Sequence, residues 1–156
     1  MMEQAQTSAA GLRIHQIARG DIARVMRNPD LRSLLARGMA AARVDDAMPT
    51  ILHLMAGTKQ LWLLFAEDSS KPLAAWTTVI LPDEGAAHWM VIGELAGSQA
   101  PRWARMVSER MVAFARDEGC NRVSFFGKRG WGRLVRGFIE IGEHDGIWVF
   151  ERRLTP

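Results

Sequence analysis

Residues 127–138, GKRGWGRLVRGF, combine glycines, basic side chains and aromatic rings in a way that could bind phosphate. The glycines permit a tight turn, and Lys128 and Arg129 add positive charge. No Ser or Thr follows Lys128, so the spacing of a nucleotide-binding phosphate loop is missing. Packing on a sheet explains more, because four apolar residues recur at helical spacing: Trp131, Leu134, Val135 and Phe138. The exposed basic residues that remain are candidates for a docking surface: Lys128, Arg129, Arg133 and Arg136.

Metal and nucleophilic chemistry have weaker support in the sequence. His15, His53 and His144 have no partners at metal-ligand spacing, so no metal is expected. No Ser-His-Asp order and no Cys-His pair stands out. The single cysteine, Cys120, excludes an internal disulfide, fits a reducing compartment, and is expected to be a small, partly buried apolar residue after a helix.

The elements that must position these residues follow from hydrophobic periodicity and turn signals. Strands are predicted at 12–17, 60–68, 73–81, 87–95, 122–127, 139–143 and 146–154, and helices at 31–44, 48–57, 101–118 and 130–137, with a further helix that begins at residue 22. The strand at 60–68 is a continuous apolar run, and Gly57 and Gly119 are expected to end the helices before them. The helix at 101–118 carries one apolar stripe of five residues: Trp103, Met106, Val107, Met111 and Phe114. The fold class is therefore α/β, or α+β with a mixed sheet. An antiparallel meander is followed by a β-α-β crossover, and helices cover both faces of the sheet.

One domain is expected at residues 11–156, a length that can bury a core, after a flexible or partner-bound arm at residues 1–10. No window approaches the roughly 18 unbroken apolar residues of a membrane helix. The N-terminus lacks the basic and apolar regions of a secretory signal.

Charge is divided along the chain. Residues 1–43 carry seven Arg against three acids, a net charge of +4, and residues 44–100 carry two Lys against seven acids, a net charge of −5. Residues 101–156 carry eleven basic residues against seven acids, again a net charge of +4. Such a two-signed surface suits docking of charged neighbours, although scattered solvated arginines explain the pattern equally well.

The order of elements over residues 11–154 resembles the GCN5-related N-acetyltransferase fold. The closing segment, AFARDEGCNRVSFFGKRGWGRLVRGFIEIGE, carries the best match. Its GKRGWGRL stretch further resembles small acetyltransferase-like proteins encoded among the structural genes of tailed bacteriophages. The family holds the pyrophosphate of acetyl-CoA in the loop before its long helix, which implies Leu95, Ala96, Gly97, Ser98 and Arg102 in this chain.

This sequence departs from the family pattern in that loop. It reads LAGSQAPRW, where Gly97 is a lone glycine and Pro101 lacks an N–H donor, so the phosphate cradle is degenerate. The family commonly protonates the departing thiolate with a tyrosine, and this chain has none. Glu94 is the best-placed general base and His88 the next. The structural alternative for Glu94 is an edge or loop carboxylate in contact with solvent or a helix N-terminus.

Two hypotheses of function follow. The first is a non-catalytic, virion-associated assembly protein that contacts portal, tail or internal virion proteins, with no cofactor and possible homo-oligomers. It would be found in the host cytoplasm during assembly and then in the virion. The alternative is an N-acetyltransferase that uses acetyl-CoA and an amine. Nucleic acid contact is not favoured, because the middle of the chain is acidic.

Overall fold

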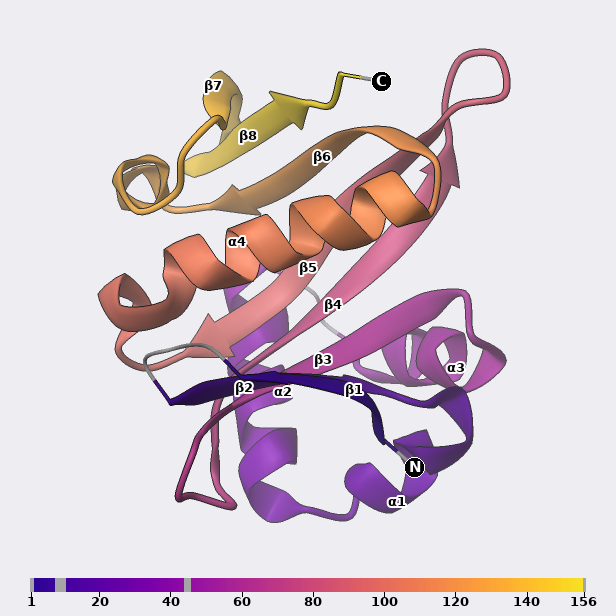
Figure 1. The fold of residues 1–156 in the computed structure, drawn as a ribbon, viewed down its shortest axis with the longest axis vertical. Coiled ribbons are helices and arrows are strands. Elements are labelled where there is room, and N and C mark those ends of the chain that lie inside the picture. The colour runs from indigo at the N-terminus through magenta and orange to yellow at the C-terminus, as the bar shows by residue number, and fades with distance from the viewer. Residues whose placement is uncertain (1, 8–10, 44–45, 156) are drawn as a thin grey trace. The chain divides into compact units, whose positions relative to one another are not determined.

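The computed structural model describes residues 2–7, 11–43 and 46–155 (Figure 1). The chain divides into two compact units. The first comprises Met1–Thr78 with Gly93–Gln99, and the second comprises Val79–Ile92 with Ala100–Pro156. Strands β4 (Pro72–Pro82) and β5 (His88–Gly97) are each divided between the two units, β4 after Thr78 and β5 after Ile92.

The sheet of the first unit begins with three antiparallel strands, β1 (Met2–Thr7), β2 (Leu12–Ile17) and β3 (Lys59–Ala66). The start of β4 and the end of β5 follow as hydrogen-bonded neighbours, which confirms the predicted meander. Residues 2–7 belong to the segment expected to be a flexible or partner-bound arm, and their backbone pairs with β2. A polar sequence pattern does not reveal an edge strand whose hydrogen bonds come from the backbone.

Helices connect β2 to β3 in this unit. A short 3₁₀ turn, η1 (Arg19–Asp21), precedes α1 (Ile22–Val25), α2 (Pro29–Ala41) and α3 (Met48–Ala56). The carboxamide oxygen of Asn28 accepts bonds from the first amides of α2, from Asp30 at 2.9 Å and Leu31 at 3.2 Å. Gly57 ends α3 in the left-handed region with φ of +81°, as predicted.

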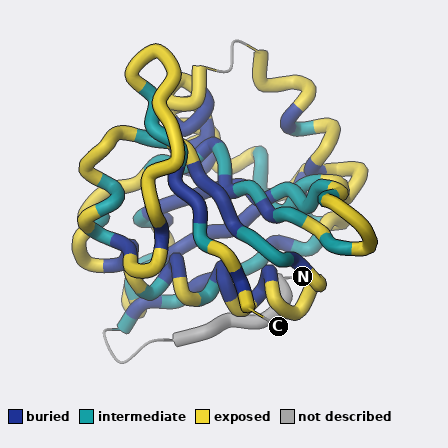
Figure 2. The backbone as a smooth tube through the Cα atoms, turned by 90° about the horizontal axis from the view of Figure 1, so that it is seen from above, coloured by how far each residue is buried: buried dark blue, intermediate teal, exposed yellow. Residues whose placement is uncertain are grey.

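The core of the first unit lies between the helices and one face of its sheet. Leu61 and Leu63 of β3 pack with Leu31, Leu35 and Leu54 of the helices. Trp62 and Leu64 point to the other face and are also fully buried. Burial of both faces explains why β3 has a continuous apolar run rather than an alternating one. Figure 2 shows buried stretches of the backbone in the interior and exposed residues in the outer turns.

One polar side chain lies inside this unit without a hydrogen bond. His15 of β2 is 6% exposed and packs edge-on against Phe65, with 5.6 Å between ring centroids. Neither ring nitrogen has a hydrogen-bond partner among the described residues. Burial, and then the positive charge of Arg13, hold the pKa of His15 below its ordinary value.

The substitution His15→Met is expected to remove a pH dependence of stability. A histidine pKa that is lowered in the folded state means that the unfolded chain binds more protons. The contribution of neutral His15 to the free energy of unfolding is therefore complete above about pH 6.5 and falls as the pH drops below that value. Urea unfolding between pH 5 and 8 measures this slope. His88→Met is the matched control, because His88 is exposed, and an equal slope in wild type and His15→Met would contradict the expectation.

The second unit contains the crossover. Its strands run in the order β4-β5-β6-β8-β7, with β6 at Cys120–Gly127, β7 at Ile139–His144 and β8 at Ile147–Arg153. β5 and β6 are parallel and are joined by α4 (Ala100–Asp117), whereas β8 is antiparallel to both β6 and β7. The predicted mixed α/β sheet, with a meander and then a β-α-β crossover, is confirmed.

α4 lies along β6 (Figure 1) and buries one apolar stripe. Four of the five residues predicted for this stripe are buried: Trp103, Val107, Met111 and Phe114. The fifth, Met106, is half-buried. Gly119 follows the helix with φ of +76°, as expected for a residue that ends it.

The helix predicted at 130–137 is wrong. A short 3₁₀ turn, η2 (Arg129–Arg133), stands there instead. Glycines disfavour a helix, and a Cβ on Gly132 would lie 2.8 Å from a ring carbon of Phe150. The packing interpretation holds for Val135 and Phe138, which are buried, and Phe138 lies 5.1 Å from Phe125 between ring centroids.

Candidate functional site

Glu94 is buried at an irregular point of β5. As a residue it is 6% exposed, and its φ of +44° lies in the left-handed region, which is rare for a residue inside a strand. A positive φ interrupts the extended pattern of a strand locally, as in a β-bulge, and this irregular point at Glu94 is called the bulge of β5 below. The structural alternative, an edge or loop carboxylate in contact with solvent or a helix N-terminus, is wrong, because Glu94 is buried within β5. A sequence pattern does not show what covers a residue near the end of a strand.

Both carboxylate oxygens of Glu94 accept hydrogen bonds. Lys59 Nζ lies 3.0 Å from Oε1, and the Thr50 hydroxyl donates to the same oxygen at 3.4 Å. The Thr77 hydroxyl donates to Oε2. These donors come from α3, β3 and β4, so three elements converge on one buried carboxylate. The ionised form of Glu94 is therefore paired and solvated by protein groups.

α2 packs directly on this bulge. A Cβ added to Gly38 would lie 2.2 Å from the carbonyl oxygen of Glu94 and 2.6 Å from its carbonyl carbon. Gly38 is buried in the middle of a helix, where alanine would otherwise be preferred. The close approach of α2 to the β5 backbone therefore explains the glycine, and it fixes the position of the bulge.

The loop predicted to hold a pyrophosphate starts in the first unit. Leu95 and Ala96 are half-buried, whereas Gly97 and Ser98 are exposed. A Cβ on Gly97 would lie 2.6 Å from the Cβ of Ala74, so this glycine permits close pairing with β4. The Ser98 amide donates to the Leu73 carbonyl at 3.0 Å. The structure thus uses Gly97 and the Ser98 amide for strand pairing.

The remaining predicted residues of this site belong to the second unit. Arg102 is exposed in the first turn of α4, which contains no acidic residue and therefore favours an anion. His88 is exposed at the first position of β5.

The four basic docking candidates all lie on the surface of the second unit: Lys128, Arg129, Arg133 and Arg136. Arg129 has two partners within the unit: its guanidinium forms an ion pair with Glu140 at 2.9 Å and lies 4.5 Å from the ring centroid of Trp148. Docking of a partner on this surface stays a prediction.

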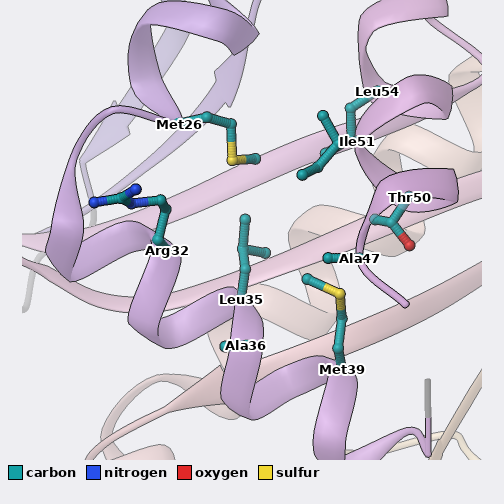
Figure 3. Close-up of a pocket in the computed structure, with 9 residues that line it drawn as sticks. All are labelled: Met26, Arg32, Leu35, Ala36, Met39, Ala47, Thr50, Ile51 and Leu54. Atoms are coloured by element: carbon teal, nitrogen blue, oxygen red, sulfur yellow. The ribbon is translucent and has the colours of Figure 1, made fainter. Parts of the chain in front are cut away.

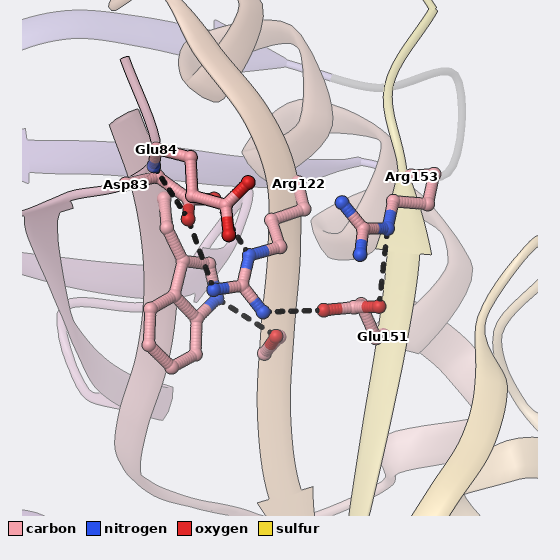
Figure 4. Close-up of polar contacts among 7 residues, drawn as sticks. Asp83, Glu84, Arg122, Glu151 and Arg153 are labelled. Carbon is pink, nitrogen blue, oxygen red and sulfur yellow. Dashed lines mark hydrogen bonds and ion pairs between the residues drawn. The ribbon is translucent and has the colours of Figure 1, made fainter. Parts of the chain in front are cut away.

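A charged network that the sequence pattern did not reveal surrounds Arg122 of β6 (Figure 4). Its guanidinium is 2.8 Å from Asp83 Oδ2 and 2.8 Å from Glu151 Oε1. The same group lies 4.0 Å from the ring centroid of Trp89, whose indole N–H donates to Ser124. Glu151 also pairs with Arg153 at 3.4 Å. The partners are far apart in sequence, so no local spacing pointed to them.

The free energy of unfolding of the Asp83→Asn variant is expected to fall less steeply at low pH than that of the wild type. Hydrogen bonds from Arg122 and then from the Glu84 amide hold the pKa of Asp83 below its ordinary value. The unfolded chain then binds more protons, so this stabilisation is full above about pH 3.9 and is lost as the pH falls through the folded-state pKa. Urea midpoints from pH 3 to 6 test this, with exposed Asp117→Asn as the control. Parallel slopes for Asp83→Asn and wild type would refute it.

Metal binding and membrane insertion are two further functions that the described residues bear on. Among residues 2–7, 11–43 and 46–155, no group of three or more His, Cys, Asp or Glu side chains is arranged to hold a metal ion. Cys120 is buried, and burial raises the pKa of its thiol. No helix in the described part of the chain combines the length and the apolar character needed to cross a bilayer.

Solved structures share this fold over nearly its full length. An acetyltransferase from Streptococcus agalactiae has a TM-score of 0.57 at 15% identity, covering 92% of this chain and 99% of that one. An acetyl transferase from Salmonella typhimurium that modifies the N-terminal serine of a 50S ribosomal subunit protein has a TM-score of 0.58 at 12% identity, covering 97% of this chain and 100% of that one. FeeM, an N-acyl amino acid synthase from uncultured soil microbes, has a TM-score of 0.61 at 10% identity, covering 96% and 92%.

Sequence comparisons give no corresponding match. No family model matches the chain, and no curated protein matches it. At such low identity the structural similarity shows the fold alone. The chain has the acetyltransferase fold that was expected from its resemblance to GCN5-related N-acetyltransferases.

Proposed function

We propose, from its acetyltransferase fold, that this chain transfers an acetyl group from acetyl-CoA to the amine of an acceptor. The observation that carries the proposal is the bulge of β5 at Glu94, in a fold shared at nearly full length with acetyltransferases. A strained backbone held by tight packing and buried hydrogen bonds is common where a protein positions reacting groups. Here the bulge is held in place by the close packing of Gly38 and by the hydrogen bonds that Lys59 and Thr77 donate to Glu94.

Acetyl-CoA would be bound through its diphosphate. The first turn of α4, in the second unit, would hold the diphosphate of the donor with Arg102. The fit is favourable in charge, because that turn lacks acidic residues and Arg105 follows one turn later. The turn offers fewer hydrogen-bond donors than it could, because Pro101 has no N–H.

The reaction needs one proton to move from the amine to the leaving thiolate. The amine nitrogen attacks the thioester carbonyl, a C–N bond forms, and the C–S bond breaks. Glu94, or a water that it orients, would take the proton from the amine. The sequence contains no tyrosine, so solvent would return a proton to the thiolate.

Calorimetry with acetyl-CoA tests the proposal. We expect saturable micromolar binding that Arg102→Glu weakens about tenfold or more, since it places a negative charge at the N-terminal turn of α4. Arg116→Glu, near the other end of the same helix, is the matched control and is expected to bind as the wild type does. No heat at millimolar acetyl-CoA would overturn the proposal.

A second candidate function, the non-catalytic virion-associated role, has one supporting observation. The carboxylate of Glu94 is already bound by Lys59, Thr50 and Thr77, which also suits a purely structural residue. The compared structures are named as enzymes and give this role no support. It predicts that the chain binds no acetyl-CoA and is present at a fixed copy number in purified phage particles.

A further inference from the structure

A cavity of about 320 Å³ lies between the helices of the first unit (Figure 3). Met26 lies above it just after α1, Leu35 and Met39 of α2 lie on one side, and Ile51 and Leu54 of α3 lie on the other. This volume is at the lower end of the range for small-molecule sites, roughly 300–1,000 Å³. The cavity is therefore large enough for a small ligand without rearrangement of the helices.

The wall of the cavity is almost entirely apolar. Besides the residues above, Ala36 and Ala47 line it, and its polar residues are Thr50 and Arg32. The Thr50 hydroxyl donates its hydrogen to Glu94, so that donor is not directed at a ligand. Met26 and Met39 have flexible, polarizable side chains that adapt to the shape of an apolar guest. The interior thus favours a hydrocarbon chain over a polar molecule.

Arg32 supplies a positive charge at the edge of this cavity. It is exposed, and although its backbone N–H donates to the Asn28 carbonyl, its guanidinium has no hydrogen bond or ion pair with the residues that the structure describes. The helix positions that would reach it, three and four residues away, hold Asn28, Pro29, Leu35 and Ala36, none of which is acidic. An anionic group at the mouth of the cavity would therefore meet an arginine that is not already neutralised.

We propose that this cavity binds a medium-chain fatty acid, with its hydrocarbon chain among the apolar side chains and its carboxylate at Arg32. The charge complementarity at Arg32 selects a carboxylate over a neutral or cationic head group. The neighbouring surface of α3 exposes Met48, Leu52 and Met55 at 55%, 58% and 48%, and it is the competing place for an apolar molecule to bind. The inference depends on the cavity and not on acetyl transfer.

Methyl NMR of the full chain with sodium octanoate tests the proposal. The signals of Met26 and Met39, assigned by Met→Leu variants, are expected to shift saturably. Met90, buried in the second unit, is expected to stay unchanged. Ala36→Phe fills the cavity from an exposed helix position and is expected to abolish the shifts, and Ala47→Phe repeats the test should the first variant not fold.

Head-group selectivity is tested with Arg32→Gln. We expect octanoate to bind about tenfold more weakly, as for the loss of one charge-assisted hydrogen bond, while octanol is unaffected. Arg37→Gln is the control on the same helix, because Arg37 does not line the cavity. Shifts confined to Met48 and Met55, an absence of shifts at millimolar octanoate, or octylamine binding as tightly as octanoate would each overturn the proposal.

Discussion

Gly38→Ala is expected to lower the free energy of unfolding by about 3 kcal/mol, because the new methyl group meets backbone rather than a movable side chain. Its Cβ would lie 2.2 Å from the Glu94 carbonyl oxygen, so either α2 or the β5 bulge must shift. The helical propensity of alanine, which is better than that of glycine by about 1 kcal/mol, would otherwise predict a gain. A loss of stability in Gly38→Ala would therefore show that close packing at Gly38 outweighs helix propensity, and a gain would show the reverse.

Urea denaturation at constant pH measures this difference. Gly130→Ala is the matched control, because a Cβ at Gly130 meets nothing within 4 Å and its φ is not positive. We expect its free energy of unfolding to stay within about 0.5 kcal/mol of the wild type. If Gly38→Ala were as stable as Gly130→Ala, the close approach of α2 to Glu94 would not exist in solution.

Lys59→Met is expected to destabilise the protein by about 2 kcal/mol, because it leaves a buried carboxylate without its cation. The Glu94 side chain is only 7% exposed, and that of Lys59 is 21% exposed. The residual exposure of Lys59 places the expected loss below the roughly 3–5 kcal/mol of a fully buried pair. Thr50 and Thr77 still donate to Glu94, but they add no positive charge.

The double variant Lys59→Met with Glu94→Gln identifies the cause. A neutral amide keeps an oxygen acceptor for the threonines and needs no cation, so most of the lost stability is expected to return. Lys71→Met is the control. The Lys71 side chain is 74% exposed and lies 3.9 Å from Asp30, and such an exposed ion pair contributes little to stability. If Lys59→Met and Lys71→Met had equal effects, the Glu94 ion pair would be unimportant for stability.

The sequence was sufficient where the signal is local and apolar. The unbroken run of β3, the stripe of α4 and the helix-ending glycines Gly57 and Gly119 all depend on neighbours in the chain, and each was predicted correctly. The segment at 130–137 was misjudged, because apolar residues at helical spacing also suit a glycine-rich turn that packs on Phe150.

The candidate site was less predictable than the fold. Glu94 was identified as the leading carboxylate, but neither its burial nor its partners from α3, β3 and β4 have a local signature. The same holds for Arg122 of β6, which meets Asp83 in the turn after β4 and Glu151 of β8 only once the chain has folded. Gly38 was overlooked, since a glycine within a helix signals close packing only when its neighbour is known.

The division of β4 and β5 between the two units has a practical consequence for dissecting the protein. A fragment that stops after Thr78 would lack Gly93–Gln99, and with it the glutamate that Lys59 needs. No single cut of the gene yields either half intact. Limited proteolysis is therefore expected to unfold both units together, and an attempt to reconstitute them from separate pieces needs three breaks and four peptides rather than one break and two.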